Sequence, residues 1–248
     1  MTEDRTLSDL VDAAGFLADR GLVTRTADCA LPSLFEACHE EAYAKGGVGF
    51  AAWPKTKWSW AGTLGMRDDV FVLKIHNGKN VFLTTETIAL ADPACRAELA
   101  RMRAEDPAWR RLLDYLADVG PSPLATVREE LGLRPRELTA LRYPLERCGA
   151  LVSRQAEVEA GDGGHEHTSE LARYDQLVPG TPASPGDPVS ALGDLVVAGV
   201  RASVVAPEHE LRRWFSWRWY FDAGLVDHLV ADGRLARPAP GWVSTGGI

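Results

Sequence analysis

Several features that mark whole classes of protein are missing from this 248-residue sequence. No apolar run approaches the roughly 18 residues that a membrane-spanning helix needs, so we expect no contact with a membrane. The first ten residues are polar and acidic, which argues against a secretory signal peptide. The four cysteines are widely spaced and form no Cys-x-x-Cys pair, so neither a zinc site nor a disulfide framework is predicted. These absences predict a reduced, cytoplasmic protein.

The signatures of cofactor and nucleophile chemistry are missing too. The glycine-rich stretch 161–164 lacks the strand-to-helix context and the lysine of a phosphate-binding loop, and no Gly-x-Ser-x-Gly motif occurs. We therefore predict no cofactor and no bound metal, and we assign no catalytic residue. His76 near Lys74, and His209 beside Glu210, are candidates for proton transfer, but histidines beside charged groups are also common on surfaces.

The formal net charge of −8 argues against a protein coated with positive charge for nucleic acid. The charge is unevenly distributed, however. Residues 96–154 carry 11 Lys and Arg against 9 Asp and Glu, whereas residues 155–206 carry 2 against 8. All five lysines lie between Lys45 and Lys79. Because binding depends on the local field, the total charge leaves DNA binding open.

Hydrophobic periodicity predicts an α+β fold that is mainly helical. The strongest local signal is Asn77-Gly78 between the β-rich runs 70–75 and 80–85, which is typical of a hairpin. The predicted helices cover 7–20, 31–45, 86–103, 107–118, 124–131, 134–148, 189–200, 207–219 and 221–232. The other predicted strands are 150–159, 167–175, 233–237 and 241–244.

In the centre of the chain, the predicted order is three helices followed by a two-stranded ribbon. This is the order of elements in a winged helix-turn-helix. In such a module the third helix is the candidate DNA reader and the ribbon is the wing. The same order recurs near the C-terminus, so we predict tandem winged helix-turn-helix modules. Their predicted bounds are 1–105 for an N-terminal module with a Trp-rich segment and a hairpin, 106–176 for a central winged helix, 177–188 for a proline-rich linker and 189–248 for a C-terminal winged-helix-like module.

Motifs spread over nearly the whole chain carry a family resemblance. They are Pro32-Ser33-Leu34, the cluster Trp53…Trp58-x-Trp60, the hairpin 73–84, the segment 211–217 and Gly241-Trp242-Val-Ser244. By these residues the chain resembles the AlkZ-like, YcaQ-related winged-helix family, and within it the shorter AlkZ-related proteins.

The resemblance implies tandem winged-helix modules and a role around DNA. Glycosylases of the wider family excise alkylated or crosslinked bases, and some protect antibiotic producers from their own DNA-damaging product. Their catalytic signature is similar to Gln-x-Gln, or to a His/Gln/Asp variant of it. This chain has only two glutamines, Gln155 and Gln176, and Gln155-Ala-Glu157 lies on a predicted wing strand. The chain therefore has no Gln-x-Gln motif that would support base excision.

Three basic stretches are candidates for DNA contact. In the first, lysines alternate with tryptophans, which would place cations on phosphates and flat rings on exposed bases. In the other two, arginines on the helices 134–148 and 207–219 would bond phosphates or guanine edges. The candidate DNA-binding residues are Lys55, Lys57, Trp58, Trp60, Lys74, Lys79, Arg134, Arg136, Arg142, Arg212, Arg213 and Arg218.

Each stretch has a structural alternative. The tryptophans would fill a small core, sharing one face if 58–60 is extended, and the lysines would be solvated. Glu137 and Glu146 share the helix 134–148, and the acidic wing would repel a phosphate backbone. Three functions stay open: a DNA-binding protein of DNA repair or self-resistance, a non-catalytic winged-helix regulator or scaffold, and an enzyme that handles a small molecule on the same fold. The oligomeric state is not predicted.

Overall fold

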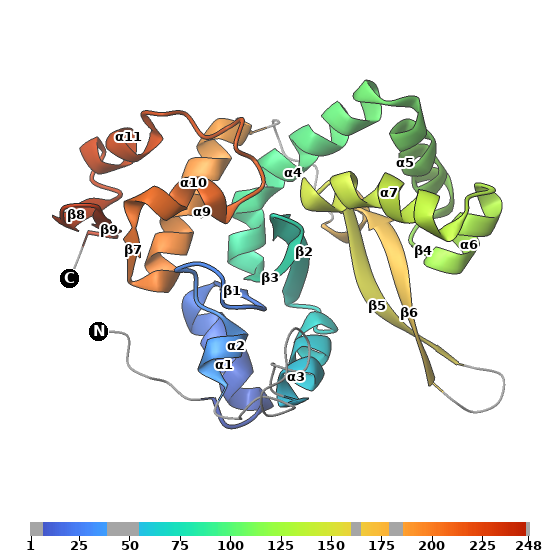
Figure 1. Cartoon of the computed structure of the whole chain (residues 1–248), viewed down its shortest axis with the longest axis horizontal. Helices are drawn as coiled ribbons and strands as arrows, with labels where there is room; N and C mark the ends of the chain where they lie inside the picture. The colour runs from blue at the N-terminus through green and yellow to red at the C-terminus, as the bar shows by residue number, and fades with distance from the viewer. Residues whose placement is uncertain (1–6, 39–54, 160–164, 179–185, 247–248) are drawn as a thin grey trace.

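The computed structural model describes residues 7–38, 55–159, 165–178 and 186–246, and for 55–58, 155–159 and 165–168 it describes the backbone alone. The fold is α+β, as predicted, with helices and short antiparallel sheets along the chain (Figure 1). The predicted linker falls mainly on residues outside these ranges. Among the described helices, none is long and apolar enough to span a membrane.

One order of elements occurs three times: helix, strand, two helices, then two strands. The first unit consists of α1 (Leu10–Arg20), β1 (Leu22–Thr24), α2 (Leu34–Ala37), α3 (Lys55–Gly65), β2 (Val70–His76) and β3 (Lys79–Thr84). The second consists of α5 (Pro107–Val119), β4 (Ser122–Pro123), α6 (Leu124–Glu130), α7 (Pro135–Arg147), β5 (Leu151–Glu159) and β6 (His165–Arg173). The third consists of α9 (Pro188–Ser203), β7 (Val205–Pro207), the 3-10 turn Glu208–Glu210, α10 (Leu211–Trp214), α11 (Leu225–Ala231), β8 (Ala236–Ala239) and β9 (Trp242–Ser244).

The three sheets of the described chain also share one topology. Their strand orders are β1-β3-β2, β4-β6-β5 and β7-β9-β8, so in each sheet the last strand lies between the other two. All pairings are antiparallel. The β5–β6 ribbon is the longest and extends away from α6 and α7 (Figure 1). The short strands β1, β4 and β7, none of which the sequence predicted, complete the three sheets.

Two further helices connect the units. The helix α4 (Thr85–Glu105) leads from the first unit to the second, and α8 (Tyr174–Leu177) follows the second. The helix α4 runs unbroken through Pro93. It packs along α9, so the first and third units share one hydrophobic core. The ranges 1–105 and 189–248 are therefore joined by packing, although they are far apart in sequence.

Local signals explain most of these elements. The helix α1 ends at Gly21, whose φ of 76° suits a glycine at a helix C-terminus. The hairpin turn has positive φ at both central residues, 52° at Asn77 and 88° at Gly78, which is the reason that Asn-Gly favours such a turn. The helices α5, α6, α7 and α11 and the ribbon β5–β6 also lie where their patterns predict. The helix predicted over 31–45 is described only as far as residue 38, and there it is the four-residue α2.

In two tryptophan-rich segments the backbone differs from the one that the sequence analysis considered. Trp58 and Trp60 are not on an extended segment, because Lys55–Gly65 is helical, and Trp60 and Leu64 lie one turn apart in the core. The helix predicted over 207–219 ends at Trp214, and Phe215 is extended. Trp214, Phe215 and Trp217 are all buried. Adjacent positions of a helix point in different directions, so an extended chain buries this set more completely than one helical face could.

Trp217 should contribute much of the stability of the shared core. Its side chain is fully buried, and its indole nitrogen donates a hydrogen bond to the carbonyl of Cys148 at 2.9 Å. We expect Trp217→Ala to lower the free energy of unfolding by about 3–5 kcal/mol, measured by urea denaturation, because it opens a cavity and leaves a buried carbonyl unpaired. Trp242→Ala is the matched control, since Trp242 is 44% exposed, and it should change stability by less than about 1 kcal/mol. Equal losses from the two substitutions would contradict this assignment.

Candidate functional site at the tip of the first hairpin

The β2–β3 turn lies where the three units meet. Its Asn77 donates its side-chain amide to the carbonyl of Arg213 at 2.7 Å and its main-chain amide to the Ser216 hydroxyl at 3.2 Å. The Ser216 amide in turn donates to the carbonyl of Ile75 at 2.7 Å. A turn that would be solvated in an isolated hairpin is therefore bound to the segment that follows α10.

The second unit reaches the same turn through α7. A Cβ added to Gly78 would lie 2.9 Å from the hydroxyl oxygen of Tyr143, so the phenol ring packs directly on this glycine. Tyr143 is 49% exposed even so. Positive φ and this close approach both favour glycine at position 78. The ring of Tyr143 thus covers one side of the turn and presents the rest of its surface to solvent.

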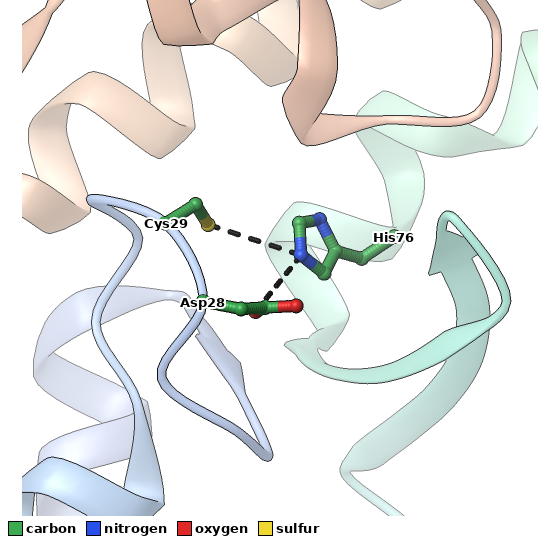
Figure 2. Close-up of side chains that lie close together, drawn as sticks. All are labelled: Asp28, Cys29 and His76. Atoms are coloured by element: carbon green, nitrogen blue, oxygen red, sulfur yellow. Dashed lines mark hydrogen bonds and ion pairs between the residues drawn. The ribbon is translucent and has the colours of Figure 1, made fainter.

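A cluster of three chemically reactive side chains lies beside the turn (Figure 2). Asp28 and Cys29 come from the loop after β1, and His76 is the last residue of β2. The Nε2 atom of His76 lies 3.1 Å from a carboxylate oxygen of Asp28 and 3.9 Å from the sulfur of Cys29. One polar atom from each of the three lies within 4.8 Å of the other two.

Main-chain and side-chain bonds hold this cluster in place. The other ring nitrogen of His76, Nδ1, lies 2.5 Å from the carbonyl oxygen of Trp214, and the His76 side chain is almost fully buried. The amide of Ala30 donates to a carboxylate oxygen of Glu210 at 2.8 Å, which binds the loop to the third unit. The Arg25 amide donates to the carbonyl of Asn80, which keeps the start of the loop beside the hairpin.

The electrostatics of the cluster favour a protonated thiol. Burial, together with the nearby carboxylates of Asp28 and Glu210, raises the pKa of Cys29 from its ordinary value to about 12. A thiol whose pKa is higher in the folded chain than in the unfolded chain favours folding while it is protonated. That contribution is present below pH 9 and is lost as the pH rises towards 12. Lys79 forms an ion pair with the other carboxylate oxygen of Asp28.

Two cavities adjoin the hairpin at Asn80. The first has a volume of about 450 Å³ and is lined by Asp28, Lys79, Asn80, Phe35 and the segment 25–27. It shares Asp28 with the cluster. The second, of about 200 Å³, lies between α3, the hairpin and the ribbon β5–β6. Both are concave, mix apolar and polar groups, and have charged side chains at their edges, as ligand sites commonly do.

The lysines and tryptophans predicted to contact DNA have different surroundings. Trp60 is buried in the core of the first unit, so its ring has no face for a base. Lys74 is bound to the Glu146 carboxylate at 3.0 Å and to the Ser153 hydroxyl at 2.9 Å, and Lys79 is paired with Asp28. The side chains of three others on α3 lie outside the described part of the chain: Lys55, Lys57 and Trp58.

The arginines predicted on α7 are divided between ion pairs and solvent. Arg134 is exposed and bonds the carboxylate of Glu137, while Arg142 is mostly buried and bonds Glu146 at 2.7 Å. The hydrogen bond with Arg134 lowers the pKa of Glu137. Arg136 is exposed and has no hydrogen bond or ion pair with any described residue. Of these three arginines, Arg136 is the one whose guanidinium has no carboxylate partner among the described residues.

The arginines predicted near the third unit are exposed. Arg212 is exposed and makes no ion pair within the described ranges. Arg213 is exposed too, and its carbonyl accepts the hydrogen bond from Asn77. Arg218 is also exposed, and its guanidinium donates to the Asn77 side-chain oxygen at 3.3 Å. The structure thus brings Arg213 and Arg218 to the tip of the first hairpin, about 140 residues away in sequence.

Sequence reasoning missed the Asp28–Cys29–His76 cluster. His76 was singled out with Lys74 as its neighbour, but Lys74 is bound to Glu146 and Ser153. The His76 ring is bound instead to Asp28 and Cys29. The only sequence signal for this cluster was the adjacent pair Asp28-Cys29 in a loop. That pair does not indicate His76 as the third member. No family model matches the chain, and neither a curated protein nor a solved structure matches it.

We predict slow alkylation of Cys29 in the native protein. The thiolate is the reactive form, and a pKa of about 12 leaves little of it at pH 8. After treatment with a chelator, native protein should react with iodoacetamide at Cys29 at least about tenfold more slowly than protein unfolded in urea. Mass spectrometry of the labelled peptide measures both rates, and the native rate should rise as the pH is raised. Equal rates in the native and unfolded protein would show that the thiol is unperturbed.

Proposed function

We propose that this chain is a tandem winged-helix protein that binds duplex DNA. The observation that carries the proposal is the threefold repeat of helix, strand, two helices and two strands, with the last strand central in each sheet. A winged helix-turn-helix has three helices and a hairpin wing. In the second unit α7 occupies the position of the reading helix, and β5–β6 occupies that of the wing. The resemblance of the sequence to AlkZ-related proteins points the same way.

A group of arginines that no carboxylate of the described residues pairs with supports the same proposal. Arg136, Ala140 and Tyr143 recur at helical spacing on α7, and all three are exposed. Tyr143 lies against the turn of the first hairpin, beside which Arg213 and Arg218 are exposed. We call these residues, with Arg212, the hairpin-tip surface. It presents cations that no carboxylate of the described chain neutralises, together with an aromatic ring, in a protein whose net charge is negative.

The hairpin-tip surface is suited to phosphates more than to bases. Arginine donates in pairs to phosphate oxygens, and such contacts position a protein on DNA without reading its sequence. The carboxylates of Asp28 and Glu146 are already paired with Lys79 and Lys74, which reduces their repulsion of a phosphate backbone. The 200 Å³ cavity between the hairpin and the wing would be the place for an extruded nucleotide, if the protein acts on one.

DNA binding and its salt dependence test this proposal. We expect a fluorescently labelled duplex to bind at 50 mM salt and to dissociate as the salt is raised, because phosphate contacts release counterions. Arg136→Ala and Arg218→Ala should each weaken binding by about three- to tenfold and reduce the slope of log K against log salt by about 1. Fluorescence anisotropy measures both quantities.

Arg201→Ala is the matched control for these substitutions. Arg201 lies on α9, is exposed, and forms no ion pair with the residues that the structure describes. The substitution Arg201→Ala removes the same charge from another surface, so DNA binding should be unchanged. No binding of the wild-type protein at low salt would refute the proposal and favour a protein or small-molecule partner. An abasic product from alkylated duplex, seen after alkaline cleavage, would assign a glycosylase rather than a reader.

A further inference from the structure

We propose that Asp28, Cys29 and His76 form a binding site for a divalent transition-metal ion, with Zn²⁺ the best match. Imidazole nitrogen, thiolate sulfur and carboxylate oxygen are the three donor types that zinc takes from proteins. Mg²⁺ and Ca²⁺ prefer all-oxygen ligands, so the sulfur and nitrogen argue against them. The proposal is independent of the DNA-binding function.

The spacing of the donor atoms fits one ion. With metal bonds of about 2.0–2.3 Å, neighbouring donors of a tetrahedral site lie roughly 3.3–3.7 Å apart. In this structure Nε2 of His76 is 3.1 Å from the Asp28 oxygen and 3.9 Å from the Cys29 sulfur. The Asp28 oxygen and the Cys29 sulfur lie within 4.8 Å of each other. These two side chains would approach each other by up to about 1 Å to complete three corners of a tetrahedron. Figure 2 shows both side chains directed at the same ring nitrogen.

The hydrogen bond of the other ring nitrogen is the stronger argument. A carbonyl oxygen can only accept, so Nδ1 of His76 carries the proton that it donates to Trp214 at 2.5 Å. In the neutral ring, Nε2 is then an acceptor, and it faces the carboxylate oxygen of Asp28, another acceptor. A cation between these two atoms removes their repulsion. Metal-binding histidines commonly donate their second N–H to a carbonyl in this way.

The Cys29 thiol is only a weak donor at 3.9 Å and leaves the contact of Nε2 with the Asp28 carboxylate unrelieved. The cation that relieves it is either a proton on the ring or a metal ion, and the third side chain distinguishes the two. A protonated ring would be satisfied by Asp28 alone and would need no sulfur. Cys29 adds the softest donor of the protein repertoire at the same nitrogen, in a loop held by Glu210. The ion pair of Lys79 with the second oxygen of Asp28 orients the carboxylate, as partners of metal ligands do.

Three protein ligands leave one tetrahedral corner for a water molecule or another ligand. Structural zinc sites use four protein ligands, whereas sites with three keep an exchangeable position. Asp28 also lines the 450 Å³ cavity, so that corner is within reach of a molecule bound there. A ligand with an anionic or thiolate donor is the chemical class that this corner would accept, with Lys79 beside it.

Cobalt substitution tests the site directly. Protein treated with a chelator and then dialysed is titrated with Co²⁺ in the absence of oxygen. We expect one equivalent to produce a thiolate-to-cobalt charge-transfer band and the intense visible bands of a tetrahedral ion, and added Zn²⁺ to abolish both. Cys29→Ser should remove the charge-transfer band, and Asp28→Asn should weaken binding by about tenfold or more.

Controls separate the site from adventitious binding and from misfolding. Cys38→Ser removes a half-buried thiol outside the cluster and His209→Gln removes an exposed imidazole, and both should leave the titration unchanged. His76 is buried, so a result from His76→Gln counts only if the circular dichroism spectrum of the variant matches that of the wild type. If the spectra differ, Asp28→Asn tests the site instead, because the Asp28 side chain is partly exposed. Absence of a charge-transfer band in the wild type, or its persistence in Cys29→Ser, would overturn the proposal.

Discussion

The carbonyl of Ile75 accepts two hydrogen bonds from Ser216, one from its amide at 2.7 Å and one from its hydroxyl at 2.9 Å. These bonds, with those of Asn77, fasten the first hairpin to the segment after α10. Tyr143 covers the turn from the second unit. One tight turn thus contacts both the second and the third unit. The fully buried Trp214 and Trp217 flank the contact and exclude water from it.

This dependence explains which parts of the fold could be predicted. Asn77-Gly78 encodes its turn locally, and α5 and α7 carry regular apolar stripes, so their sequences suffice. The segment after Trp214 could not be read in the same way. Trp214 and Trp217 have helical spacing, yet the chain is extended at Phe215 because Ser216 pairs with Ile75, 141 residues away. A long-range contact there overrides local periodicity.

The candidate sites show the same limit. Basic residues were easy to find in the sequence, but their partners were not. Lys74, Lys79 and Arg142 are bound to carboxylates from distant or neighbouring segments, whereas Arg136 and Arg218 are not. Cys29 and His76 are 47 residues apart, and no spacing rule for metal ligands relates two such positions. Charge in the sequence therefore overestimates the charge that is available to a ligand.

His76 connects the two features of the hairpin tip. Its Nδ1 holds the carbonyl of Trp214 in the third unit, and its Nε2 faces Asp28 and Cys29 in the first. Whatever occupies the cluster must act on a ring whose other nitrogen fixes the junction between units. Because the ring is rigid, a cation at Nε2 would also strengthen the bond from Nδ1 by making that N–H more acidic. The cluster is thus connected to the junction of the first and third units through a single imidazole, and Arg212, Arg213 and Arg218 of the hairpin-tip surface flank Trp214, whose carbonyl this imidazole binds.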